Sequence, residues 1–86
     1  MKKPDLRGNK GLSPDEALLL ISRFAEQNPV EFERWKAVEV QGSSLNDIFD
    51  SLKKFLQENC EYNSLTDLTL GVVELRRAMH AAVNRQ

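Results

Sequence analysis

Residues 64–86 read SLTDLTLGVVELRRAMHAAVNRQ, and the apolar pattern in this stretch decides the fold. Apolar side chains recur at alternating spacings of three and four, which is the seam that two helices in contact require. The members of this seam are Leu65, Leu68, Val72, Leu75, Met79 and Ala82. Leu70, Val73 and Val83 lie off the seam, so the first half of the helix is apolar on almost every side. Such a helix is normally surrounded by neighbours, which predicts an all-α domain with this helix at its centre.

A first helix is predicted to begin after Ser13 and to run to about residue 27. Ser13 and Glu16 have the spacing of a capping box, and Pro14 stands at the first helical position, where its missing N–H is not needed. Its core face is expected to contain Ala17, Leu18, Ile21, Phe24 and Ala25, with Leu20 at the margin and Leu19 on the far side. Asn28 precedes a proline and is therefore excluded from the helical region, so the helix ends there.

A second helix is predicted over residues 29–40, with Phe32 and Trp35 as its large apolar anchors. Asn28 can cap it and Pro29 suits its first position. The alternation of Val30 with Phe32, repeated by Val38 and Val40, also fits a strand. A single strand has no partner, and no other segment of the chain is strand-like, so the helix is favoured.

A third helix is predicted to end near residue 59, and Gly42 is expected to separate it from the second. Ser43 or Ser44 would cap it. Its seam consists of Leu45, Ile48, Leu52 and Phe55, widened by Phe49 and Leu56. The amphipathic pattern is the clearest in the chain and predicts that this helix packs on the last one.

The last helix is expected to begin after the Ser64–Asp67 pair and to cover residues 65–84. At 1.5 Å per residue it would be ~30 Å long, against ~20 Å for each of the first two helices. Its second half should therefore extend beyond the ends of the shorter helices. Gly71 inside it lowers the stability of the helix by about 1 kcal/mol relative to alanine. A glycine at this position therefore predicts that another helix approaches the backbone closely there. The expected architecture is a four-helix antiparallel bundle-like domain over residues 13–86.

Residues 1–12 contain two glycines, one proline and no apolar periodicity, so they are predicted to form a flexible basic arm. Leu6 or Leu12 could attach the arm to the helical body. The arm carries a charge of +3, residues 13–67 carry −6, and residues 68–86 carry +2. Basic ends around an acidic middle can attract polyanions, although cations in the last turn also oppose the helix dipole.

The number of cysteines and the length of the apolar runs limit the class of protein. Cys60 is the only cysteine, so an internal disulfide is excluded. No apolar run approaches the ~20 residues of a membrane span, and no apolar stretch follows Lys2 and Lys3 as in a signal peptide. A lone free thiol is typical of a reducing compartment, so a cytoplasmic protein without membrane contact is expected.

Candidates for catalysis are few. His80 has no acid within one helical turn, and Glu61 beside Cys60 is expected to raise the pKa of the thiol and weaken it as a nucleophile. The serines at helix starts, Ser43, Ser44 and Ser64, are explained as caps. We therefore predict a protein that is not an enzyme, with no catalytic residue, cofactor, metal centre or small-molecule substrate.

Nucleic-acid binding is the alternative function. A helix-turn-helix around Gly42 would point Asp47 and Asp50 at DNA phosphates, which is the wrong charge for binding. A second possible nucleic-acid site would use the basic side chains of the last helix together with those of the arm. The possible polyanion contacts are Lys2, Lys3, Arg7, Lys10 and Arg85, with Arg76, Arg77 and His80 on the same helix as Arg85. No aromatic residue lies among these basic side chains, which disfavours a single-strand site in which nucleobases stack on aromatic rings.

The preferred function is a small protein–protein interaction module, namely an adaptor, an assembly factor or an inhibitor. The overhanging last helix and the apolar residues left off the seams indicate a surface for a homodimer or a larger protein partner, with self-association expected through the third and fourth helices. The predicted interface residues are Leu19, Leu70, Val73, Arg76, Arg77 and His80. The opposing interpretation is a monomer whose core absorbs these residues.

Overall fold

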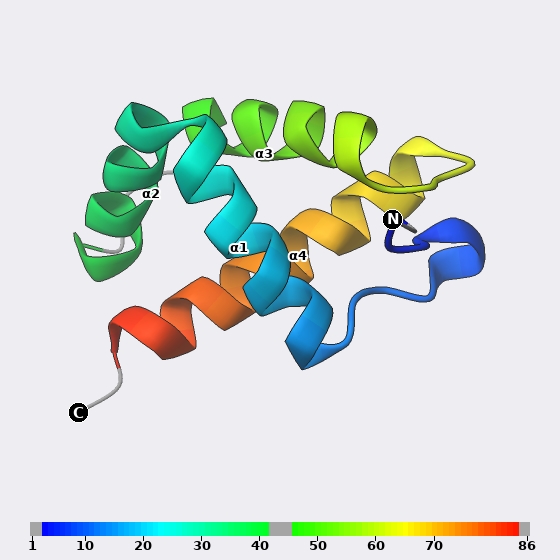
Figure 1. Ribbon diagram of the computed structural model, residues 1–86, viewed down its shortest axis with the longest axis horizontal. Helices are drawn as coiled ribbons and strands as arrows, with labels where there is room; N and C mark the ends of the chain where they lie inside the picture. The colour runs from blue at the N-terminus through cyan, green and yellow to red at the C-terminus, as the bar shows by residue number, and fades with distance from the viewer. Residues whose placement is uncertain (1–2, 42–45, 85–86) are drawn as a thin grey trace.

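The computed structural model of the chain describes residues 3–41 and 46–84. In these ranges it shows an all-α domain in which three helices pack against the C-terminal one, as the apolar seam of that helix predicted (Figure 1). The elements are a 3₁₀ turn η1 (Arg7–Asn9) and the helices α1 (Pro14–Gln27), α2 (Pro29–Gln41), α3 (Asn46–Asn59) and α4 (Leu65–Val83). Helix α1 crosses α4 obliquely, and α3 runs back along it in roughly the opposite direction.

The predicted helix starts are confirmed at α1 and α4. The Ser13 hydroxyl accepts a hydrogen bond from the Glu16 N–H at 3.2 Å, and the Glu16 carboxylate accepts one from the Ser13 N–H at 3.0 Å. Ser64 and Asp67 form the same capping box at α4. These reciprocal bonds satisfy backbone donors that have no partner inside the helix.

The boundary between α1 and α2 is also confirmed. Asn28 leaves the helical region with φ −136° and ψ 65°, as expected before a proline. Helix α2 is helical along its whole length, so the strand alternative is wrong. The predicted turn and caps at Gly42, Ser43 and Ser44, and the seam residue Leu45, lie outside the described residues.

The core joins all four helices. Its centre is a set of edge-to-face aromatic contacts, in which the Phe24 ring lies 5.6 Å from Trp35 and 5.2 Å from Phe55 between centroids. Most described members of the α3 and α4 seams are buried against this core inside one chain, namely Ile48, Leu52, Phe55, Leu56, Leu68, Val72, Leu75 and Met79. The predicted seam residues Leu65 and Ala82, near the two ends of α4, are exposed instead. The buried seam residues are therefore not available for a second molecule.

One helix face differs from the expectation. Leu20 is fully buried, whereas Leu18 and Leu19 are each 52% exposed. The sequence placed Leu18 in the core face of α1 and Leu20 at its margin. Three consecutive leucines span most of a helical turn, so the exact rotation of α1 against α4 decides which one is buried.

Residues 3–12 are packed against the helices, whereas the sequence predicted a flexible basic arm over residues 1–12. They form a strap along the first half of α4, with Leu6 fully buried in the core and Leu12 largely so. The Leu6 N–H donates to the Glu61 carbonyl and the Glu61 N–H donates to the Pro4 carbonyl, both at 2.8 Å. This packing leaves no periodic pattern in the sequence, because the buried strap residues Pro4, Leu6 and Leu12 are unequally spaced.

The interior glycine of α4 is explained by the strap. Gly71 is buried, and the side chains of Leu6 and Leu56 both reach its backbone. The predicted close approach is thus confirmed, although it comes from one side chain of α3 and one of the strap. The last turns of α4 extend away from the strap (Figure 1). Within the described ranges, no helix combines the length and apolar character needed to cross a bilayer.

Candidate interaction surface

The C-terminal half of α4 gathers four of the predicted interface residues around one depression. Its volume is about 360 Å³, and it is lined by Val73, Arg76, Arg77, His80 and Ala81 of α4 together with Glu39 of α2. Val73 is 37% exposed at this site. An aliphatic residue with two arginines beside it is therefore presented on the outer side of the helix.

Glu39 fixes one wall of this depression. Its side chain is only 5% exposed, and its carboxylate accepts a hydrogen bond from the Trp35 indole N–H at 3.3 Å and one from the Arg76 guanidinium at 3.4 Å. A buried carboxylate needs such partners, because burial without them is costly. Arg76 is consequently held against α2, whereas Arg77 is 77% exposed and lies 3.9 Å from Glu74.

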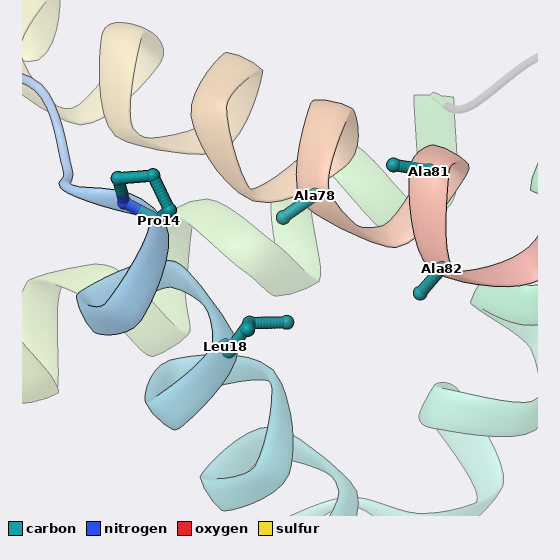
Figure 2. Close-up of a pocket in the computed structure, with 5 residues that line it drawn as sticks. All are labelled: Pro14, Leu18, Ala78, Ala81 and Ala82. Atoms are coloured by element: carbon teal, nitrogen blue, oxygen red, sulfur yellow. The ribbon is translucent and has the colours of Figure 1, made fainter. Parts of the chain in front are cut away.

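An apolar groove lies on an adjacent side of the same helix half (Figure 2). Its volume is about 240 Å³, and it is lined by Pro14 and Leu18 of α1 and by Ala78, Ala81 and Ala82 of α4. The Leu18 side chain extends toward the gap beside Ala78 and Ala82. Ala81 lines both the groove and the charged depression, so the two hollows meet on α4.

The remaining predicted interface residues lie apart from these hollows. Leu70 is half-buried on α4, and Leu19 projects from α1 and lines neither hollow. The sequence analysis missed Leu18, Glu39 and the three alanines. The spacing of Trp35 and Glu39, four residues apart on one helix, could have indicated the indole–carboxylate bond; the alanines carry no comparable signal.

The predicted polyanion contacts do not converge. In the strap, Arg7 lies 3.0 Å and Lys10 lies 3.6 Å from Asp5, and hydrogen bonds from Arg7 hold the pKa of Asp5 well below its usual value. The strap follows the first half of α4, while Arg76, Arg77 and His80 lie on the second half (Figure 1). Lys3 is exposed; Lys2 and Arg85 lie outside the described residues.

The candidates for catalytic chemistry are also separated. Cys60 is buried just before α4, and desolvation raises the pKa of its thiol to about 11, with Glu16 adding to the rise. His80 is exposed near the opposite end of α4, where its Nδ1 lies 3.3 Å from the Asn84 side-chain nitrogen. In the described part of the chain, no three His, Cys, Asp or Glu residues come together as metal ligands.

Comparison with known proteins yields no relative: no family model matches this chain, and no significant match is found among curated proteins or solved structures.

Proposed function

We propose that this chain is a non-enzymatic protein–protein interaction module, such as an adaptor, an assembly factor or an inhibitor, and that it self-associates through the C-terminal half of α4. The observation that carries the proposal is the junction at Ala81 of an apolar groove with a charged depression. Protein interfaces commonly combine an apolar centre with a polar or charged rim, and arginine is enriched in them.

The charge distribution around the groove supports a second copy as the partner. On the α1 side, the exposed Asp15 follows Pro14, whereas Arg77 is exposed on α4. In a two-fold dimer each surface meets its own image, so α1 of one copy can face α4 of the other and opposite charges can meet. The contact would use the outer side of α4 and the groove, because most seam residues of α3 and α4 are buried within the monomer.

Solution mass by light scattering tests this proposal, measured at two concentrations and two salt levels. We expect a dimer that persists at high salt, because its centre is apolar. Ala81→Glu should give a monomer, since it places a charge where both hollows meet. Ala37→Glu is the matched control, because Ala37 is also exposed but lies on α2.

Val73→Glu provides a second test, with Val30→Glu as its control at an exposed valine of α2. We expect the first substitution to weaken the dimer and the second to leave it intact, while the far-ultraviolet circular dichroism of both stays that of the parent protein. A parent chain that is monomeric under every condition, or a dimer unaffected by Ala81→Glu, would contradict self-association at this surface.

A further inference from the structure

The strap closes an apolar slot between α3 and α4. The side chain of Leu6 is fully buried and reaches the backbone of Gly71, where Leu56 forms the neighbouring wall. We propose that the strap is a releasable cover, which detaches from α4 while the four helices remain folded and so opens this slot. The chain would then have a closed and an open form that differ in the apolar surface they expose.

Few contacts hold the strap. Its buried side chains are those of Pro4, of the fully buried Leu6, and of Leu12 at the junction with α1. The backbone is held by the two hydrogen bonds with Glu61 and by the Asn9 N–H, which donates to the Asp67 carboxylate at 3.1 Å. The ion pairs of Arg7 and Lys10 are with Asp5 inside the strap, so they tie the strap to itself.

Conformational entropy favours release. Gly8 and Gly11 have φ of 71° and 70°, and glycine loses more conformational freedom on folding than any other residue, so it also regains the most on release. Release also restores the conformational entropy of about ten residues, which docking had removed. Both effects oppose the burial of Leu6.

Most of the buried core residues belong to the helices and only Leu6 and Leu12 of the core cluster belong to the strap. The aromatic contacts of Phe24 with Trp35 and Phe55 join α1, α2 and α3, and the α3 and α4 seams bury most of the remaining apolar surface. Partial opening of a weakly anchored segment around a stable core is a general property of proteins. Here the opening has a defined consequence, because it uncovers the Leu6 slot and frees the N–H and C=O groups of Glu61.

Native-state hydrogen exchange, followed by NMR on the full chain, tests the proposal. The amides of Leu6, Asn9 and Glu61 report on the strap, and the amide of Leu75 in the middle of α4 reports on the helices. We expect the three strap amides to share one protection factor, at least tenfold below that of Leu75, and to depend only weakly on urea. Equal protection of both groups would mean that the strap opens only by global unfolding, and no protection at all would mean that it does not dock; either result overturns the proposal.

Leu6→Ala tests the anchor. We expect it to accelerate exchange at Asn9 and Glu61 at least tenfold, with a much smaller effect at Leu75. Leu65→Ala, a change at an exposed leucine of α4, should leave the strap amides unchanged. Equal acceleration at all sites after Leu6→Ala would show that the strap belongs to the cooperative core and would overturn the proposal.

Discussion

Leu6 and Gly71 are in direct contact although 65 positions separate them: a Cβ placed on Gly71 would lie 2.9 Å from one methyl carbon of Leu6. It would lie equally close to a methyl carbon of Leu56. A glycine inside a helix is unfavourable by itself, and this contact provides the compensation. The strap and α3 can both reach the helix backbone only because no side chain intervenes.

Gly71→Ala should destabilise the chain by about 1 kcal/mol. Overpacking typically costs about 1–3 kcal/mol, and the better helix propensity of alanine returns about 1 kcal/mol. Leu6 and Leu56 are both fully buried and have little room to turn aside. Urea unfolding followed by Trp35 fluorescence measures the change; a gain in stability would show that the leucines yield freely. In the double variant with Leu6→Ala, part of the loss should disappear, because one of the two clashes is removed.

Asp67→Asn should lower the free energy of unfolding by about 1–3 kcal/mol, the usual cost of leaving buried polar groups unsatisfied. The buried carboxylate accepts from the N–H groups of Asn9, Asn63 and Ser64, and an amide offers only one oxygen. The midpoint of urea unfolding is the measurement. Asp15→Asn, an exposed acid in the first turn of α1, is the control and should change stability by less than about 0.5 kcal/mol.

Arg76→Ala and Arg77→Ala should differ although the residues are adjacent. Arg76 donates to the buried Glu39, so its removal leaves that carboxylate with the Trp35 indole and should cost about 1–2 kcal/mol, a value reduced because Arg76 is itself half-exposed. Arg77 makes only a long, exposed pair with Glu74, and its loss should stay within about 0.5 kcal/mol. Thermal unfolding of both variants side by side tests this; equal effects would contradict a specific role of Glu39.

Stability should fall as the pH rises above 9, because the thiol of Cys60 has a pKa of about 11 in the folded chain against 9.0 as its ordinary value. Between these values the folded state keeps the thiol proton and the unfolded state has released it, so raising the pH favours unfolding. The contribution of the thiol is complete below pH 9 and decreases by about 2–3 kcal/mol as the pH approaches 11.

Urea titrations at several pH values measure this loss, and Cys60→Ala separates it from the titration of tyrosine and lysine. We expect the pH dependence of the alanine variant to be shallower in this window by the amount assigned to the thiol. Identical slopes for the two proteins would show that the thiol is hydrated in the folded chain.

Helix ends were the most predictable part of the fold. The capping boxes at Ser13 and Ser64 and the break before Pro29 all appear where the sequence placed them. These signals consist of hydrogen bonds and steric limits that act within about four residues, so they can be recognised without the rest of the chain. The central position of α4 was also predictable, because a helix that is apolar on most sides must be covered on most sides.

The candidate surface was predicted only in part. Val73, Arg76, Arg77 and His80 come together because they lie on one side of one helix, and helical spacing alone predicts this. Glu39 and Leu18 come from other helices, and their positions depend on how α1 and α2 rotate against α4. A rotation of a fraction of a turn exchanges a buried leucine for an exposed one, and the three leucines of α1 do not distinguish the alternatives.

The sequence by itself determined four helices, the capped starts of α1 and α4, the break before Pro29 and the helix at the centre, because local hydrogen bonding and apolar periodicity depend on neighbouring residues. Tertiary structure alone decided that the strap docks, that Leu18 remains exposed, and that Glu39 is buried beside Arg76. Each of these outcomes depends on contacts between distant segments. These contacts form only when the helices have packed, so the pattern of neighbouring residues does not predict them.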